Sequence, residues 1–174
     1  MAPDVFVQST VNRASEILSS DIPKEIKIEK LKIIAEETVD INGIGFYTLG
    51  SFRKTLNDEQ KKRYKDLFKK YFLKSFSSRL AEYSNPEIQV NSKEILNDKY
   101  TIVSSILVAT KDRPKVKIDW RIYTKNPSNP LIRDLIIEGL SLARTQKEEF
   151  ASIISSNDGN ISALFDTLEK FISN

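Results

Sequence analysis

Residues Asn57 to Tyr83 read NDEQKKRYKDLFKKYFLKSFSSRLAEY, and this stretch decides the fold. Asn57 lies three residues before Gln60, a spacing typical of a capping box at the start of a helix. At 1.5 Å per residue the helix is about 40 Å long, so other elements must pack along it. Its large apolar residues recur at spacings of three and four, which places them on one face that must be covered; they are Tyr64, Leu67, Phe68, Tyr71, Phe72, Phe76, Leu80 and Tyr83.

The pattern of apolar residues predicts three helices before this stretch, over residues 7–18, 24–39 and 41–49. Asp40 is expected to cap the third of these helices, and Gly50 is expected to end it. Gly43 and Gly45 lie inside the third helix and cost about 1 kcal/mol each relative to Ala. Either this helix is irregular, or another group approaches its backbone closely.

After Ser84-Asn85-Pro86 the apolar period changes from that of a helix to that of a strand. The pattern predicts four antiparallel strands, within residues 87–96, 99–110, 114–125 and 131–139. In the third strand apolar and polar residues alternate, which indicates one buried and one wetter face of the sheet; the apolar set is Val116, Ile118, Trp120 and Ile122. Gly139 is expected to bend or bulge the fourth strand.

Two further helices are expected at the C-terminal end. Thr145 to Glu148 resembles a capping box and predicts a helix over residues 148–155, and residues 161–173 form the last amphipathic pattern. The order of elements indicates one α+β domain spanning residues 1–174. We expect N-terminal helices, an antiparallel sheet of about four strands, and C-terminal helices that together enclose a hydrophobic pocket.

The composition of the chain narrows the classes of function that are possible. The 174 residues are 40% hydrophobic, and 27 basic and 24 acidic residues are interleaved to give a net charge of +3, so dedicated nucleic-acid binding is not expected. The chain has no Cys and no His, which excludes thiolate and Ser-His-Asp catalysis and the common zinc sites. We expect no metal site and no cofactor. No segment approaches the roughly 20 apolar residues that span a bilayer.

Carboxylates on the predicted strands leave an enzyme open as an alternative. Asp119, Asp134 and Glu138 lie on neighbouring strands, and a cone-shaped α+β domain with an inward carboxylate could abstract a proton next to a carbonyl. Strand carboxylates are more often solvated or paired with Lys and Arg. The aromatic face of the long helix is likewise more often ordinary core than pocket.

Four runs in this order resemble the MlaC family, the toluene-tolerance or auxiliary components of ABC transport systems. They are VDINGIGFYTLGSF, the long stretch quoted above, VKIDWRIY and IRDLIIEGLSLARTQKEEFASII. The most specific run is Asp134 to Ile154, where the family has an Asp, an apolar triplet, Glu-Gly-x-Ser and then an aromatic residue in a helix. The resemblance covers the chain from about Val7 to Phe171. Two departures are Arg53, where the family tends to have an aromatic residue, and Asn129-Pro130, where it has a Trp.

The resemblance implies a non-enzymatic periplasmic carrier, monomeric, that moves glycerophospholipid between an outer-membrane lipoprotein complex and an inner-membrane ABC transporter with its MCE-domain protein. Such a carrier maintains the lipid asymmetry of the outer membrane. The first residues, MAPDVFVQST, lack the apolar core of a signal peptide, so this location requires that a leader has been removed. The phospholipid headgroup is expected at the pocket mouth near Arg53 or Arg144. The acyl chains are expected to contact Phe46, Leu49, Phe68, Tyr71, Phe72, Phe76, Ile106, Val108, Ile118, Trp120, Leu135, Ile137, Leu142 and Phe150.

Overall fold

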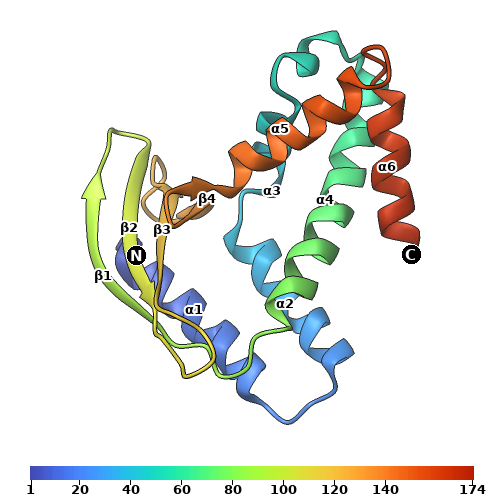
Figure 1. Cartoon of the computed structure of the whole chain (residues 1–174). Helices are drawn as coiled ribbons and strands as arrows, with labels where there is room; N and C mark the ends of the chain where they lie inside the picture. The colour runs from blue at the N-terminus through green and yellow to red at the C-terminus, as the bar shows by residue number, and fades with distance from the viewer.

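An antiparallel sheet and a long helix stand opposite each other in the computed structural model, which describes residues 1–174 (Figure 1). The sheet has five strands in the order β1-β2-β3-β4-β5, so every strand pairs with its neighbour in the sequence. The strands are β1 (Ile88–Ile95), β2 (Tyr100–Leu107), β3 (Val116–Tyr123), β4 (Leu131–Ile137) and β5 (Leu140–Ser141).

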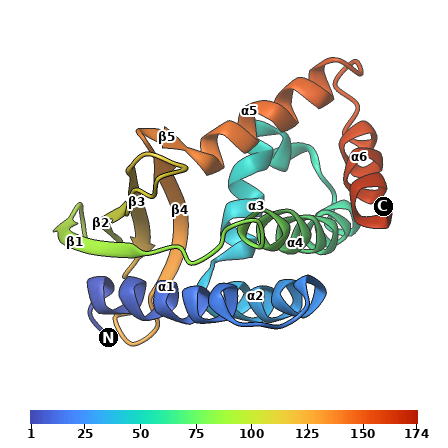
Figure 2. The same ribbon diagram turned by 60° about the horizontal axis from the view of Figure 1, so that its bottom comes forward.

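The helices cover one face and one end of this sheet. They are α1 (Pro3–Ser19), α2 (Lys24–Thr38), α3 (Ile41–Leu49), α4 (Asp58–Leu80), α5 (Leu142–Ser155) and α6 (Ser162–Ser173), with a short 3-10 helix, η1 (Gly50–Thr55), before α4. Helix α1 packs on β1 and β2, and α2 packs on α1 and α4 (Figure 2). Helix α3 packs between α4 and α5, while α6 covers the outer side of α4. The predicted α+β order of elements is confirmed.

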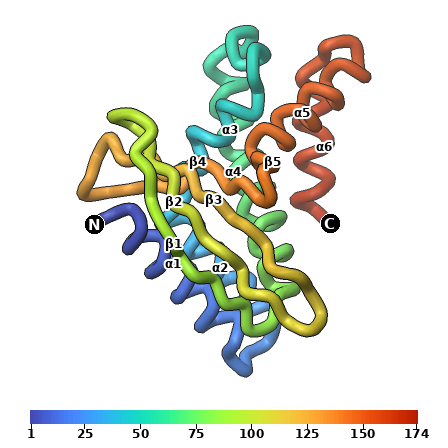
Figure 3. Tube along the Cα trace, turned by 60° about the vertical axis from the view of Figure 1, so that its left-hand side comes forward, coloured from blue at the N-terminus to red at the C-terminus, as the bar shows by residue number.

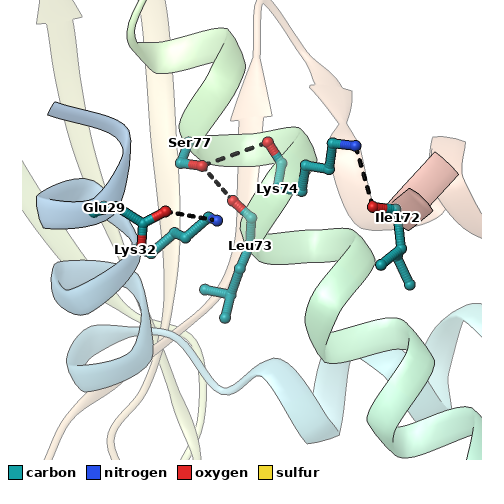
Figure 4. A network of polar contacts seen from close by, with 6 residues as sticks. All are labelled: Glu29, Lys32, Leu73, Lys74, Ser77 and Ile172. Carbon is teal, nitrogen blue, oxygen red and sulfur yellow. Dashed lines mark hydrogen bonds and ion pairs between the residues drawn. The ribbon is translucent and has the colours of Figure 1, made fainter. Parts of the chain in front are cut away.

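Helix α4 begins as the sequence predicts. The Asn57 side chain accepts from the Gln60 N–H at 2.8 Å, and the Gln60 side chain accepts from the Asn57 N–H at 3.0 Å, which completes the capping box. Near its other end, Lys74 donates from Nζ to the carbonyl of Ile172 at 3.3 Å, so the last turn of α6 is tied to α4 (Figure 4). Ser77 is 1% exposed, and its hydroxyl donates to the carbonyl of Leu73 within α4.

The sheet has one apolar face, which is turned toward the helices. On β3 the residues Ile118, Trp120 and Ile122 are buried, as their alternation predicts. On β2 the buried set is Val103, Ser105 and Leu107, together with Thr101 at the strand's start. Pairing of Ser105 with Ile118 and of Val103 with Trp120 brings both sets to the same face.

The turn after β4 differs from the prediction. Glu138 and Gly139 have φ values of 50° and 82°, and Ile137 pairs with Leu140 across them. Two consecutive residues with positive φ form the tight turn that suits a two-residue hairpin. Gly139 therefore reverses the chain instead of bulging a strand, and it creates the short fifth strand that the sequence analysis did not separate.

Helix α5 begins at Leu142, six residues before the predicted start, so the proposed capping box over Thr145 to Glu148 is wrong. The cap is Ser141, whose hydroxyl accepts from the N–H of Arg144 at 3.0 Å. A carboxylate from β4 adds a second cap, because Asp134 accepts from the N–H of Ala143 at 3.0 Å. Two of the free N–H groups in the first turn, those of Ala143 and Arg144, are thus satisfied before Thr145 is reached.

Steric contacts explain why glycine occupies positions 43 and 45 of α3. A Cβ added to Gly45 would lie 2.7 Å from Cδ2 of Phe68, so α3 and α4 approach each other at this point more closely than any side chain would permit. A Cβ added to Gly43 would meet the carboxylate of Asp40, which caps the helix by accepting from the Gly43 N–H at 3.1 Å. The close-approach alternative is confirmed, and α3 is a continuous helix.

Candidate functional site

A cavity of about 450 Å³ lies between α4 and the apolar face of the sheet. Its wall contains 33 residues, of which 23 are hydrophobic. Helices α1 and α2 form one side of it and the start of α5 forms another, so residues from almost every element of the fold contribute. The domain therefore folds around an interior that its own side chains do not fill.

Aromatic rings from α4 form one wall. Phe68, Phe72 and Phe76 follow one another along the helix, with ring centroids 6.1 Å apart for the first pair and 5.3 Å apart for the second. Phe68 is 2% exposed, whereas Phe72 and Phe76 are only half-buried. The apolar face of α4 thus changes along its length from closed core to cavity wall.

The sheet forms the opposite wall through Ile118, Trp120, Leu135 and Ile137. Trp120 carries a polar N–H on an otherwise apolar ring. This N–H donates to the hydroxyl of Ser105 at 2.8 Å, and Ser105 in turn donates to the carbonyl of Ile118 at 2.7 Å. Since both donors are used within the sheet, this wall offers the cavity an almost purely apolar surface.

Most hydroxyl groups along the helical walls also have hydrogen-bond partners within the protein. Thr10 donates to the carbonyl of Phe6 at 2.8 Å, and Thr38 donates to that of Ile34 at 2.7 Å. The Tyr71 hydroxyl donates to Oε1 of Gln146 at 3.1 Å, which connects α4 to α5 across the cavity edge. Burial raises the pKa of Tyr71, and the nearby Glu149 carboxylate raises it further, so the phenol remains neutral at ordinary pH.

Charged groups occur only at a few positions on the wall: Arg79, Asp134 and Glu149. Arg79 and Glu149 are exposed, as is Tyr83, and these side chains mark where the cavity meets solvent. Arg79 belongs to no ion pair. The cavity can therefore enclose a long apolar group while a polar end stays at its rim.

Nine of the fourteen residues expected to contact acyl chains lie on this wall: Phe68, Tyr71, Phe72, Phe76, Ile118, Trp120, Leu135, Ile137 and Leu142. Leu49 and Phe150 are 1% and 2% exposed and belong to the closed core beside the cavity. Ile106 lies on the outer face of β2, opposite to Ser105, and Val108 follows the end of that strand. Phe46 is half-buried on the other side of Phe68.

The two arginines expected at the headgroup lie away from the wall. Arg53 donates to the carbonyl of Gly50 within η1 at 3.2 Å. Arg144 is exposed on α5, where its Nε lies 3.5 Å from a carboxylate oxygen of Glu148. Sequence reasoning named both only as candidates near the phosphate, and it missed Arg79 because this residue lies off the aromatic pattern of α4.

Sequence reasoning also missed the wall contributed by the N-terminal helices. The residues of α1 and α2 on the wall are Thr10, Val11, Ala14, Ser15, Leu18, Leu31, Ile34, Ala35 and Thr38. Their helical spacing was visible in the sequence, but it is equally typical of a helix that braces a solid core. Only the distance between α1, α2 and α4 distinguishes the two cases.

The three strand carboxylates do not form a catalytic centre. Asp119 is on the outer face of β3, with Lys117 Nζ 3.8 Å from its carboxylate. Glu138 is exposed in the β4–β5 turn and accepts from the N–H of Lys117 at 2.7 Å. Of the three, only Asp134 lines the cavity wall. Its carboxylate accepts hydrogen bonds from the N–H groups of Leu135 and Ala143 and from the hydroxyl of Ser141. Its role is to join β4 to α5.

Two features are absent from this structure. No group of three or more acidic, Cys or His residues is placed to hold a metal ion. None of the helices has the length and hydropathy needed to cross a membrane.

Comparison with known proteins agrees with this geometry. The model of the family described as MlaC protein matches residues 8–170. The chain belongs to the MlaC family. The predicted resemblance is thereby confirmed, and since MlaC is not a family of enzymes, the alternative of a carboxylate enzyme is set aside.

The MlaC fold is also found among solved structures. The phospholipid-binding protein from Ralstonia solanacearum, crystallised in complex with a phospholipid, is similar with a TM-score of 0.82 at 20% identity. The match covers 99% of this chain and 98% of that one. A search of curated proteins finds no significant match. At this identity the likeness establishes the fold alone.

Proposed function

We propose that this protein binds one phospholipid and encloses its acyl chains in the cavity between α4 and the sheet. The observation that carries the proposal is the cavity of about 450 Å³ with a largely hydrophobic wall. This volume lies within the range of roughly 300–1,000 Å³ that is usual for small-molecule sites. Burying each CH₂ group contributes about 0.8 kcal/mol, so such a cavity favours hydrocarbon over water.

The arrangement of polar groups supports a lipid over a polar metabolite. The Trp120 N–H and the Thr10 and Thr38 hydroxyls are satisfied within the protein. A polar ligand would lose its hydrogen bonds with water and find few replacements inside, which costs several kcal/mol. The relative from Ralstonia solanacearum was crystallised with a phospholipid, which is the ligand class that this cavity chemistry favours.

The acyl chains are assigned to the residues that line the cavity. On the α4 side they contact Phe68, Tyr71, Phe72 and Phe76, and on the sheet side Ile118, Trp120, Leu135 and Ile137, with Leu142 at the start of α5. The N-terminal helices contribute Val11, Ala14 and Leu31. Phe46, Leu49, Ile106, Val108 and Phe150 have no place in this assignment, because they lie outside the wall.

We further propose that the bound lipid is transported through the periplasm. Its donor and acceptor would be an outer-membrane lipoprotein complex and an inner-membrane ABC transporter with an MCE-domain protein, and its role would be to maintain outer-membrane lipid asymmetry. Membership of the MlaC family supports this. Two acyl chains carry a gross transfer free energy on the order of 20 kcal/mol, so a lipid crosses water at a useful rate only inside a carrier.

A transfer assay tests the proposal. Donor vesicles containing a fluorescent phospholipid are separated from acceptor vesicles by a membrane that passes the protein but not vesicles, and fluorescence in the acceptors is followed. The wild-type protein should transfer lipid at a rate proportional to its concentration. Phe72→Asp places a carboxylate in the cavity wall and should abolish transfer. Phe46→Asp is the matched control, because Phe46 is also half-buried but lies outside the wall. Transfer that is absent with folded wild-type protein, or equal in both variants, would contradict the proposal.

A further inference from the structure

Arg113 lies in the loop between β2 and β3, and part of its guanidinium group has no partner. Its Nε and Nη2 atoms are buried and donate to no atom of the protein. Its Cζ lies 5.4 Å from the centroid of the Tyr83 ring, at the distance of a cation–π contact. A guanidinium held against a ring keeps N–H donors free at its edges. The contact with Tyr83 positions the group but leaves its donors unused.

Tyr83 connects this arginine to the cavity. Its side chain lines the cavity wall and is 42% exposed, so it lies at the rim. Arg79, four residues earlier, also lines the wall and is exposed. The rim near the end of α4 therefore carries Arg79 and Tyr83. Arg113 is not part of the wall, and it adjoins the rim through its contact with Tyr83.

Backbone contacts hold the loop of Arg113 next to this rim. The N–H of Val108 donates to the carbonyl of Glu87 at 2.8 Å, which ties the end of β2 to the connection between α4 and β1. Thr110 and Arg113 exchange backbone hydrogen bonds of 3.0 and 3.3 Å across the turn. Figures 1 and 3 both show the tip of the β2–β3 hairpin beside this connection. The orientation of Arg113 is thus part of the fold.

The two arginines near this rim form no ion pair within the protein. Neither Arg79 nor Arg113 belongs to an ion pair. The acidic residues on the same connection have other partners, since Glu82 pairs with Lys24 and Glu87 accepts from the Gln89 side chain at 2.8 Å. Ordinary roles explain the positions of both arginines: Arg79 suits the negative end of α4, and Arg113 packs on Tyr83. Neither role uses the buried N–H groups of Arg113.

We propose that Arg79 and Arg113 bind the phosphate of the lipid headgroup at this rim, with Tyr83 covering the apolar part of the lipid next to it. The inference rests on the proposed function, because acyl chains in the cavity bring the headgroup to an exposed edge. A phosphodiester offers several acceptor oxygens, and arginine binds phosphate by paired, charge-assisted hydrogen bonds. It is the chemical group that fits unused guanidinium donors and an unmatched positive charge.

The test compares two lipids with identical acyl chains, phosphatidylglycerol and diacylglycerol, of which only the first carries a phosphate. Each is titrated into delipidated protein, and the ratio of the two affinities is measured for the wild type, Arg79→Gln and Arg113→Gln. The ratio is informative because a general loss of stability or cavity volume affects both lipids alike. Arg53→Gln is the matched control, since Arg53 lies outside the wall and its guanidinium already donates to the carbonyl of Gly50 within η1.

The wild type should prefer phosphatidylglycerol by on the order of tenfold or more, as expected for charge-assisted hydrogen bonds. Each glutamine variant should reduce this preference severalfold, and Arg113→Lys should retain part of it. Equal affinities in the wild type, or an unchanged preference in both variants, would overturn the headgroup assignment while leaving acyl-chain binding intact. If neither lipid binds, the proposed function fails together with this inference.

A third titration separates a lipid phosphate from a free one. Inorganic phosphate at millimolar concentration should not displace phosphatidylglycerol and should give no binding heat with delipidated protein, because the site lies at the edge of an apolar cavity that supplies most of the affinity. Saturable binding of inorganic phosphate that is lost in Arg113→Gln would show a site for free anions and would contradict the assignment to a lipid headgroup.

Discussion

The indole N–H of Trp120 donates a 2.8 Å hydrogen bond to the hydroxyl of Ser105, which lies two residue pairs away on the neighbouring strand. Ser105 is fully buried, and its hydroxyl donates a hydrogen bond to the carbonyl of Ile118. A single serine thereby converts the amphipathic ring of Trp120 into an apolar wall element. The cavity is therefore apolar because polar atoms are paired behind its surface, as well as because of the residues that face it.

Replacement of Ser105 tests this arrangement. Ser105→Ala leaves the Trp120 N–H buried without an acceptor and should lower the free energy of unfolding by about 1–3 kcal/mol in urea denaturation. Ser104→Ala changes the half-exposed neighbour on the outer face and should stay within about 0.5 kcal/mol of the wild type. Equal effects of the two substitutions would show that the Trp120 hydrogen bond contributes nothing measurable.

Asp134 joins β4 to α5, and its replacement should loosen that junction. Asp134→Ala removes the acceptor of the Ala143 N–H and should cost about 1–2 kcal/mol, as is usual for a lost cap. Amide hydrogen exchange at Ala143 should become faster than in the wild type. Asp119→Asn, on the outer face, should change stability by no more than about 0.5 kcal/mol. Unchanged exchange at Ala143 would rule out the capping role.

Gly45 is required by the approach of Phe68. A Cβ at this position would lie 2.7 Å from the Phe68 ring, which is buried and cannot move without displacing Phe72 or Phe150. Gly45→Ala should therefore destabilise the protein by about 1–3 kcal/mol, although Ala favours a helix by about 1 kcal/mol over Gly. Asn42→Ala, at an exposed position of α3, isolates the effect of helix propensity. A stabilised Gly45→Ala variant in thermal unfolding would disprove the steric account.

Ionisation of Tyr64 should limit the stability of the folded protein at alkaline pH. Burial raises the pKa of Tyr64 above its ordinary value of 10.0, while its hydrogen bond with Thr48 opposes the shift. The folded state therefore holds the phenolic proton more tightly than the unfolded state. The resulting stability is complete below pH 10 and is lost as pH rises above it.

The variant Tyr64→Phe should be less stable than the wild type at neutral pH, by about 1 kcal/mol for the lost hydrogen bond. Above about pH 10 its stability should fall less steeply than that of the wild type, because it has no phenol to ionise. Urea denaturation over this range measures both curves. Parallel curves would mean that Tyr64 does not titrate with unfolding. Tyr83→Phe, at an exposed site, serves as control.

Local sequence signals predicted those parts of the fold that depend on neighbouring residues. The capping box of Asn57 and Gln60 fixed the start of α4, and Asp40 fixed that of α3. The start of α5 was missed because one of its two caps, Asp134, comes from another strand. A side chain eight residues before the helix leaves no signature in a search for local caps.

The cavity could be predicted in part. The aromatic residues of α4 and the alternating residues of β3 identified two walls, since both patterns specify an apolar face. Whether such faces touch each other or enclose space depends on the separation of α1, α2 and α4, which no local pattern encodes. Ile106 was expected to contact the acyl chains, yet the alternation of β2 turns Ser105 inward, where it accepts from the N–H of Trp120.

Native mass spectrometry of the protein purified from bacteria tests the central claim most directly. The account predicts one adduct with the mass of a phospholipid per chain, and loss of that adduct in Ala14→Phe, which fills the cavity from α1. Ala163→Phe, at a half-buried position of α6 outside the cavity, should keep it. A folded wild-type protein that carries no lipid under gentle conditions, and takes up none from vesicles, would contradict the account.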